Sequence, residues 1–479
     1  MSETINRPQA GKPGASFERR NPITGEVAST SRAMTAAEAT AAADRAAAAF
    51  PAWSRSSPTE RRTLLNKAAD AVDARAGELI EIMVAETGAA PAWCGFNAFL
   101  AAKMLREAAA ITTQIAGEVI PSDKPGFLAM SIRQPAGVVL GIAPWNAPLI
   151  LGTRAIAVPL ACGNTVVLKG SELCPALHEK LAEVIASAGF PEGVINVVTN
   201  APEDAADVVE ALIVHRAVRR VNFTGSTHVG KIIGRLCGEN LKPAILELGG
   251  KAPLIVLDDA DLDLAVNCAA FGAFMHQGQI CMSTERIVVD NKVADEFVAK
   301  LAAKANSLPV GDPSKGPVVL GSVVSLDAVS RVQTLVTEAV GKGAKVVAGG
   351  EATHTFMQAT VVDHVKPGMR IYGEESFGPS VSVVRVDGEE EAIRIANDTE
   401  YGLSAAVITR DIARGLRIAR RIESGICHIN GPTVQDEAQM PFGGVKDSGY
   451  GRFGGRAGIE AFSETRWITI ETETPHFPF

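Results

Sequence analysis

The sequence lacks the features that three large classes of protein require. Lys and Arg total 46 against 54 Asp and Glu, so the net charge of −8 predicts no surface for nucleic acid or an anionic membrane. The apolar runs Val138–Ala143 and Leu149–Leu160 are shorter than the roughly 20 residues of a membrane span. The polar first 15 residues lack the apolar segment of a secretory signal. The seven cysteines are odd in number and widely spaced, which favours reduced thiols in a cytoplasmic protein over a disulfide framework.

What the chain does contain is a long alternation of strand and helix patterns. Its 479 residues, 47% hydrophobic and 21% charged, are typical of a soluble protein with roughly three domains. Residues 35–115 have helical periodicity, and Gly117–Gly137 has the turn and extended pattern of a hairpin. The expected strands that follow are 138–143, 165–169, 194–198 and 220–224, and the expected helices are 148–161, 175–188, 203–215 and 227–237. This order predicts a doubly wound parallel sheet with a ligand crevice at the carboxyl ends of its strands.

A second α/β series begins after Gly249-Gly250-Lys251, with a strand at 254–257 and a helix at 261–276. Further helices are expected at 293–304, 326–340 and 389–397. The stretch Trp467–Glu471 is β-prone, and a strand at the end of a chain needs a partner, for which another subunit is one candidate.

Cys281 stands apart from the other cysteines in its surroundings. It lies in Gly278-Gln279-Ile280-Cys281-Met282-Ser283, and no second cysteine occurs within twelve positions. That spacing excludes a C-x-x-C redox or zinc motif, and no metal site is expected. A lone cysteine is commonly a small buried hydrophobe, so the residue alone does not indicate a nucleophile. His276 would suggest a Cys-His thiol hydrolase, but nothing nearby in the sequence fixes that pair.

Two polar residues follow expected strands and could act with a nucleophile. Glu247 lies between two leucines, where burial would raise its pKa toward that of a general base; a surface-facing alternation is the alternative. Asn146 follows Pro144-Trp145, and its amide could donate to an oxyanion; a simple turn residue is the alternative.

A nucleotide site is indicated at the ends of two further strands. Gly225-Ser226 opens a helix whose N-terminus suits a pyrophosphate, although a small-residue turn would have the same sequence. Ile232 follows Lys231 where a P-loop requires Ser or Thr, which argues against phosphoryl transfer. Lys169 and Glu172 could bind ribose hydroxyls, and the carboxylate would repel a 2′-phosphate, which favours NAD over NADP; solvated loop charges are the alternative.

Six motifs together resemble the aldehyde dehydrogenase superfamily over nearly the whole chain. In order they are Pro144-Trp145-Asn146, Lys169-Gly170-Ser171-Glu172, Phe223-Thr224-Gly225-Ser226, Leu246–Lys251, Gly278–Cys281 and Glu374–Pro379. The resemblance implies Cys281 as nucleophile, Glu247 as general base and Asn146 as oxyanion donor. It implies NAD as cofactor, bound by Trp145, Lys169, Glu172, Phe223, Gly225, Ser226, Glu375 and Phe377.

The same resemblance implies a domain plan and an oligomer. The NAD-binding domain would comprise residues 1–116 and 138–247, the catalytic domain 248–445, and an oligomerisation arm 117–137 and 459–479. A homodimer or homotetramer is expected, with no nucleic-acid or membrane partner. A non-catalytic binding protein with this fold would be expected to have lost Cys281, Glu247 or Asn146, and all three are present.

The substrate implied is an aromatic aldehyde. The stretches Trp93–Asn97, Ile280–Arg286 and His428–Gln435 resemble the aromatic aldehyde branch, notably salicylaldehyde dehydrogenases, with vanillin, benzaldehyde and broad-range enzymes as alternatives. Arg154 is expected to face the substrate tunnel and bind a ring hydroxyl, or else to pair with a carboxylate such as Glu437. The complete set of expected substrate residues is Trp93, Ala147, Leu151, Arg154, Ile280, Met282 and Tyr450.

Overall fold

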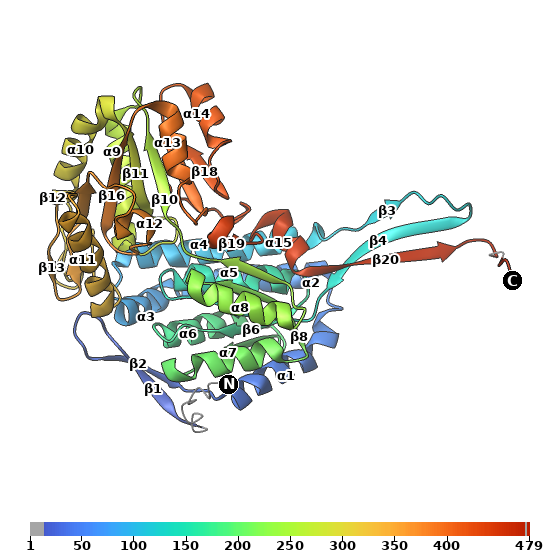
Figure 1. Cartoon of the computed structure of the whole chain (residues 1–479). Helices are drawn as coiled ribbons and strands as arrows, with labels where there is room; N and C mark the ends of the chain where they lie inside the picture. Colours follow the sequence, from blue (N-terminus) through green and yellow to red (C-terminus); the bar gives the residue numbers. More distant parts are fainter. Residues whose placement is uncertain (1–13, 475–476) are drawn as a thin grey trace, which may run out of the picture.

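The computed structural model describes residues 14–474 and 477–479. Two α/β bodies lie one above the other, and a narrow β arm projects from the lower one (Figure 1). None of the helices in these residues is long and apolar enough to cross a membrane. The first 13 residues of the predicted NAD domain and residues 475–476 of the predicted arm lie outside the described residues.

The first body is built on a six-stranded sheet that is parallel except at one edge. Its strands in spatial order are β19 (Gly449–Tyr450), β9 (Ala244–Glu247), β8 (Val218–Thr224), β5 (Val138–Ile142), β6 (Thr165–Lys169) and β7 (Ile195–Val198). Only β19 runs antiparallel, against β9. The continuous apolar runs of β5 and β6 are buried on both faces, as a parallel sheet covered by helices requires.

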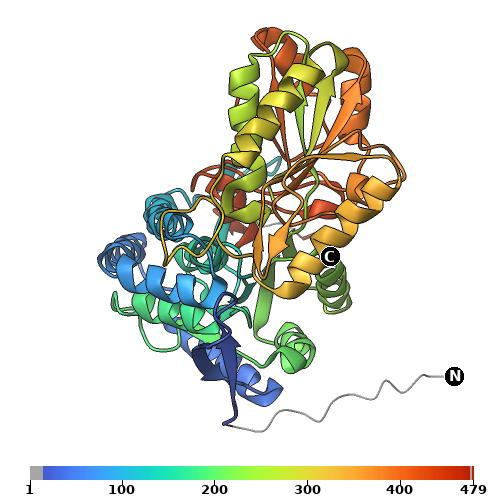
Figure 2. The same cartoon turned by 90° about the vertical axis from the view of Figure 1, so that its left-hand side faces the viewer.

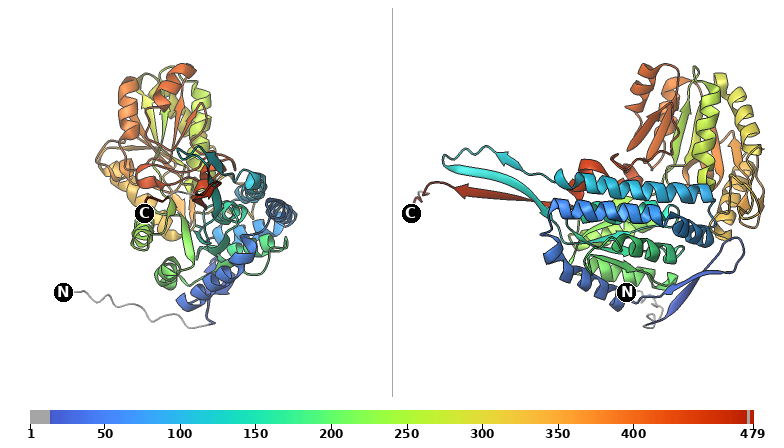
Figure 3. Two further views of the ribbon diagram at one scale, coloured as in Figure 1. Left: turned by 90° about the vertical axis from the view of Figure 1, so that its right-hand side faces the viewer. Right: turned by 180° about the vertical axis from the view of Figure 1, so that it is seen from behind.

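Helices cover both faces of this sheet, which confirms the doubly wound arrangement. One face is covered by α5 (Pro148–Ala161) and α6 (Pro175–Ala186), and outside them lie α2 (Pro58–Ala74), α3 (Ala76–Thr87) and α4 (Pro91–Ala110). The other face is covered by α1 (Ala36–Trp53), α7 (Ala205–Val214) and α8 (Thr227–Glu239). The long helices α2 and α4 run across the back of the body (Figure 3). A small hairpin, β1 (Ser16–Arg20) with β2 (Val27–Arg32), precedes them.

The second body contains a seven-stranded sheet. In spatial order its strands are β12 (Lys345–Ala348), β15 (Thr360–Asp363), β16 (Ser380–Val386), β11 (Thr284–Asp290), β10 (Ala252–Val256), β17 (Ser404–Ile408) and β18 (Ile426–Ile429). Its helices are α9 (Leu262–Phe274), α10 (Asn291–Asn306), α11 (Leu326–Gly341), α12 (Arg370–Gly373), α13 (Gly388–Asn397) and α14 (Ile412–Ala419). The short pair β13 (Ala352–Thr353) and β14 (Phe356–Met357) lies apart from the sheet. Figure 2 shows this body above the first one.

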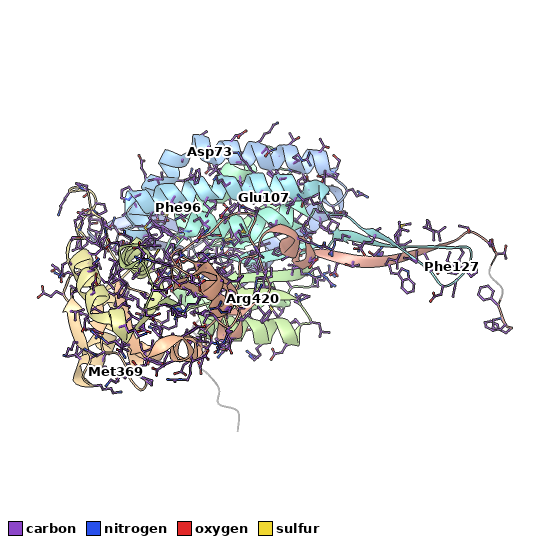
Figure 4. All side chains as sticks on the ribbon, turned by 90° about the horizontal axis from the view of Figure 1, so that it is seen from above. Asp73, Phe96, Glu107, Phe127, Met369 and Arg420 are labelled. Carbon is purple, nitrogen blue, oxygen red and sulfur yellow. The ribbon has the colours of Figure 1, made fainter. Side chains whose placement is uncertain are left out.

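The arm is a three-stranded antiparallel sheet of β20 (Ser463–Glu471), β4 (Phe127–Pro135) and β3 (Glu118–Ile120), entered through the short helix α15 (Gly455–Ala461). The predicted hairpin is present as β3 and β4. The C-terminal strand was expected to need a partner, with another subunit as one candidate; the partner lies in its own chain, because β20 pairs with β4 along its whole length. Non-local pairing of this kind leaves no mark in either strand's sequence. Phe127 lies far out along the arm (Figure 4).

Candidate active site

Cys281 follows a short and unusual turn. The 3₁₀ segment Met275–Gly278 contains three successive residues with positive φ, namely His276 at 50°, Gln277 at 55° and Gly278 at 68°. Non-glycine residues rarely adopt this conformation, so surrounding contacts must hold it. At Gly278 a Cβ atom would lie 2.1 Å from the Gly378 carbonyl oxygen, so only glycine fits there. The turn thereby brings the cysteine against the loop that follows α12.

Side chains of the turn hold it in place. The Gln277 amide donates to the Ser322 carbonyl at 2.7 Å, and the Gln279 side-chain oxygen accepts from the Val324 N–H at 2.9 Å. His276 stacks on Trp93, with ring centroids 4.9 Å apart and planes inclined by 13°. Burial lowers the pKa of His276 to about 3, so the imidazole is neutral. The thiol hydrolase alternative therefore has no support: this ring packs against Trp93 instead of acting as a base.

The Glu247 carboxyl group lies beside the thiol. It ends β9, is 1% exposed, and neither of its oxygens has a hydrogen-bond partner in the described part of the chain. Burial raises the pKa of Glu247 to about 7. The pKa of the Cys281 thiol is also raised, first by burial and then by the negative charge of Glu247. A buried carboxyl with no competing partner is free to exchange protons with the thiol and with water.

Asn146 is positioned on the other side of the cysteine segment. Its Nδ2 donates to the Gln279 carbonyl at 2.9 Å, and its own backbone carbonyl accepts from Trp93 Nε1 at 2.9 Å. These two contacts fix the side chain directly before α5. The second N–H of the amide is left to donate to an oxygen that develops next to Cys281.

Two cavities meet at these residues. One, of about 740 Å³, is lined by Pro144, Trp145, Asn146, Thr224, Gly225, Ser226, Glu247, Leu248, Gly249, Cys281, Arg331, Glu375 and Phe377. The other, of about 630 Å³, is lined by Trp93, Phe96, Asn146, Ala147, Ile150, Leu151, Arg154, Phe271, Met275, Ile280, Cys281, Met282, Val434, Gln435, Asp436 and Phe442. Asn146 and Cys281 line both cavities, so the thiol can be approached from two sides.

The first cavity suits a dinucleotide. Ser226 caps α8 by accepting from the Val229 N–H, and a Cβ at Gly225 would lie 2.4 Å from the Phe223 ring, so the chain is close-packed where a pyrophosphate would meet the helix N-terminus. Glu375 accepts from the Gly250 N–H at 2.8 Å, and the rings of Trp145 and Phe377 meet edge to face at 5.9 Å. The polar and aromatic residues at the inner end therefore fit a ribose and a flat ring.

Lys169 and Glu172 lie at the end of β6 and form an ion pair with each other. Glu172 also accepts from the Asn200 amide at 3.0 Å. They are not among the residues that line the 740 Å³ cavity, and neither is Phe223, whose ring packs under Gly225. Their ribose-binding role remains a prediction, as does the role of Phe223.

Sequence reasoning missed the buried pair that supports the Glu375 loop. Glu285 is 3% exposed and accepts from Lys251 Nζ at 2.8 Å and from the N–H groups of Ser376 and Phe377 at 3.0 and 2.9 Å. Lys251 also donates to the Glu374 carbonyl at 2.7 Å. The Lys251–Glu285 pair thus fixes the backbone of the loop that carries Glu375. Glu285 follows the cysteine by four residues in the sequence, but Lys251 lies 34 residues before it and Ser376 lies 91 residues after it, so no local pattern indicated these partners.

The second cavity has an almost wholly apolar wall with one ion pair in it. Six of the expected substrate residues line it: Trp93, Ala147, Leu151, Arg154, Ile280 and Met282. Arg154 pairs with Asp436 instead of the neighbouring Glu437, and its guanidinium lies 4.2 Å from the Phe442 ring centre. Phe96 lies at the end of α4 nearer the second body, and Glu107 lies further toward the arm (Figure 4).

Tyr450 is not among the residues that line this cavity, so its contact with substrate stays a prediction. It lies on β19, pairs with Leu246, is 52% exposed, and its hydroxyl lies near Gly234 of α8. The chain returns to the edge of the first sheet at this point, which the sequence pattern does not reveal.

Comparison with known proteins agrees with this geometry. The model of the aldehyde dehydrogenase family matches residues 9–468. This chain belongs to the aldehyde dehydrogenase family. The cofactor of this aldehyde dehydrogenase is NAD, and its first cavity has the residues to hold it.

Several relatives are similar over nearly their full length. Vanillin dehydrogenase of Pseudomonas fluorescens is 61% identical over 97% of this chain and 96% of its own. Salicylaldehyde dehydrogenase of Pseudomonas sp. (strain C18) is 51% identical with the same coverage. The crystal structure of salicylaldehyde dehydrogenase from Pseudomonas putida G7, complexed with salicylaldehyde, has a TM-score of 0.95 at 51% identity and covers 97% of this chain and 96% of its own. Betaine aldehyde dehydrogenase from Staphylococcus aureus in complex with NAD+ has a TM-score of 0.92 at 32% identity, covering 97% and 93%.

Proposed function

We propose that this aldehyde dehydrogenase oxidises a ring-hydroxylated aromatic aldehyde to its carboxylic acid with NAD. The observation that carries this proposal is the meeting of two cavities at Cys281, one suited to a dinucleotide and the other lined by aromatic and aliphatic side chains. The similarity to vanillin and salicylaldehyde dehydrogenases supports an aromatic aldehyde with a ring hydroxyl as the substrate. Vanillin dehydrogenase is 61% identical and salicylaldehyde dehydrogenase 51%, so vanillin is favoured over the salicylaldehyde expected from the sequence.

In the proposed mechanism, Cys281 must lose its proton before it can attack. Burial and the nearby carboxylate raise the pKa of the thiol, so the free enzyme holds it protonated. Glu247, with a pKa of about 7, accepts that proton when the aldehyde arrives. Sulfur then bonds to the aldehyde carbon, and the oxygen becomes an oxyanion that the Asn146 amide and the Cys281 backbone N–H stabilise.

Oxidation follows because the tetrahedral carbon can release a hydride. NAD, when bound, supplies the acceptor for that hydride. The thiohemiacetal thereby becomes a thioester on Cys281. Glu247 first releases the proton it took from Cys281 to solvent, and it then takes a proton from water, whose oxygen attacks the thioester carbon. The C–S bond breaks, the carboxylic acid leaves, and Glu247 returns its proton to the Cys281 sulfur, which restores the thiol.

The proposed oxidation of aromatic aldehydes is tested by measuring NADH formation from a panel of aldehydes. Vanillin, salicylaldehyde and benzaldehyde should be oxidised with kcat/KM well above that of an aliphatic aldehyde. Cys281→Ala should abolish NADH formation, whereas Cys427→Ala, on β18, should leave it intact. Faster oxidation of the aliphatic aldehyde than of the three aromatic ones would contradict the proposal.

We also propose a cytoplasmic homodimer or homotetramer assembled through the arm. All seven cysteines are free, as a reducing compartment would keep them. The arm carries exposed apolar side chains, with Trp467 75% and Val119 72% exposed, and β20 and β3 form its open edges. Apolar side chains on an open sheet are typical of a surface that another subunit covers.

A further inference from the structure

The wall of the second cavity, which would receive the aldehyde, contains a carboxylate with one oxygen that has no hydrogen-bond partner in the described residues. Asp436 follows β18 by a loop, and its side chain is 9% exposed. Oδ2 accepts from Arg154 Nη2, whereas Oδ1 is buried and has no hydrogen-bond partner in the described part of the chain. Buried polar atoms are nearly always paired, so an unpaired carboxylate oxygen in a ligand cavity indicates a ligand group.

The surroundings of this oxygen are apolar. Phe96, Ile150, Phe271, Val434 and Phe442 are among the side chains that line the same cavity. An unpaired buried carboxylate oxygen is costly in such a setting, and a ligand that donates to it offsets that cost.

Arg154 holds the carboxylate in one orientation. The guanidinium is 7% exposed on its side chain and packs over Phe442 at 4.2 Å and Phe453 at 5.9 Å. An arginine packed against two rings has little freedom to turn, so Oδ2 stays with Arg154 and Oδ1 is left for the substrate.

We infer that Asp436 Oδ1 accepts the hydrogen bond of the substrate's ring hydroxyl, with Arg154 as the positioning residue. This inference rests on the proposed function and deepens it. A carboxylate accepts and cannot donate, so a hydroxyl satisfies it. A methoxy group has no hydrogen to donate and leaves the oxygen unpaired. The pair therefore selects hydroxylated over methoxylated or unsubstituted rings.

The test compares matched aldehydes in one variant. For the wild type and Asp436→Asn, kcat/KM is measured on 2-, 3- and 4-hydroxybenzaldehyde, their methoxy counterparts, and benzaldehyde. At one of the three ring positions, the ratio of kcat/KM for the hydroxy aldehyde to kcat/KM for its methoxy counterpart should be about 10- to 100-fold lower in the variant. This is the usual effect of losing a charge-assisted hydrogen bond, and it should appear as a higher KM for the hydroxy aldehyde. Benzaldehyde has no ring hydroxyl to bind, so its kcat/KM should fall less than that of the hydroxylated aldehyde and serves as the reference.

Two controls keep the outcome interpretable. Glu437→Gln removes the neighbouring carboxylate, which is exposed, and should leave every ratio unchanged. The double change Arg154→Met with Asp436→Leu removes both charges together, so no unpaired charge stays buried if the single variant folds poorly. It should lower the hydroxy-to-methoxy ratio as the single variant does.

An unchanged ratio in both variants, or an equal loss on benzaldehyde, would overturn the inference. Failure of the proposed function gives a different result, because the wild type would then oxidise an aliphatic aldehyde faster than benzaldehyde and its hydroxylated relatives.

Discussion

The thiol of Cys281 and the carboxyl of Glu247 share one buried space, and the charge of the carboxylate raises the cost of charging the thiol. Burial is the largest cause of both shifts in pKa; the Glu247 charge adds to the shift of the thiol, whereas the hydrogen bond from Cys281 lowers the pKa of Glu247. One proton between the two groups is therefore the stable arrangement in the free enzyme. When the thiolate attacks the aldehyde, its negative charge moves to the substrate oxygen and away from the buried space. We therefore expect deprotonation of Cys281 to be coupled to its attack on the aldehyde.

Asn146→Ala tests the oxyanion role. Removing one such donor typically lowers kcat by about 10²–10³. Asn146 lines both cavities, so NAD titration followed by fluorescence quenching is needed to show that the cofactor still binds. An unchanged kcat would eliminate the role, and so would a loss confined to NAD affinity.

The pH profile tests Glu247. The ionised carboxylate is the active base and its pKa is about 7, so kcat should rise with pH through about 7 and level off above it. Glu247→Gln cannot accept a proton and should lose this rising limb along with most of kcat. Initial rates from about pH 5.5 to about 9 measure both enzymes. A wild-type profile that is flat across this range, or an unaltered limb in the variant, would contradict the assignment.

At the scale of elements, the turn Met275–Gly278 decides where the nucleophile lies. Its left-handed residues cost on the order of 1 kcal/mol or more each, and hydrogen bonds to Ser322 and Val324 offset that strain. Those two partners come from the segment before α11. The position of Cys281 thus depends on a distant part of the chain.

Gly278→Ala should disable the enzyme through this turn. The added Cβ would approach the Gly378 carbonyl oxygen to 2.1 Å at a φ of 68°, so the cysteine must move and kcat should fall by at least about 10²-fold. Gly238→Ala, in α8 with open space around its Cα, is the matched control and should be active and no less stable. Rates and thermal unfolding midpoints distinguish the two; equal activity would show that the turn tolerates a side chain.

At the scale of the whole molecule, the arm extends far beyond both bodies (Figure 1). A three-stranded sheet with exposed apolar side chains is poorly stable alone, and a second copy of the chain would cover it. The cavities lie away from the arm, between the two sheets. Assembly and chemistry are therefore expected to be separable by mutation.

Trp467→Glu should reduce the size of the assembly. Trp467 is 75% exposed on β20, and a charge there would be buried by the partner subunit at a cost of several kcal/mol. Leu241→Glu is the matched control, because Leu241 is 92% exposed and lies in the loop between α8 and β9, outside the strands of the arm. Light scattering coupled to gel filtration gives the mass of the assembly formed by the wild type and by each variant. The same mass for Trp467→Glu and wild type would rule out Trp467 as a subunit contact.

The sequence by itself determined the strand-and-helix order, the family, and the roles implied for Cys281, Glu247 and Asn146. Periodicity and turn residues are local, so β5, α5 and β6 lie where they were predicted within a residue. Six of seven expected substrate residues line one cavity because most lie on the two segments next to Asn146 and Cys281.

Only the tertiary structure decided which distant groups meet. Four pairings join segments that local patterns do not connect. They are the Lys251–Glu285 ion pair, the pairing of β20 with β4, the pairing of Tyr450 with Leu246, and the Arg154–Asp436 ion pair. Arg154 and Asp436 are 282 residues apart in the chain. Burial, and with it the pKa of Glu247, also arises only when both bodies close around the site, because desolvation is a property of the packed surroundings and not of the sequence nearby.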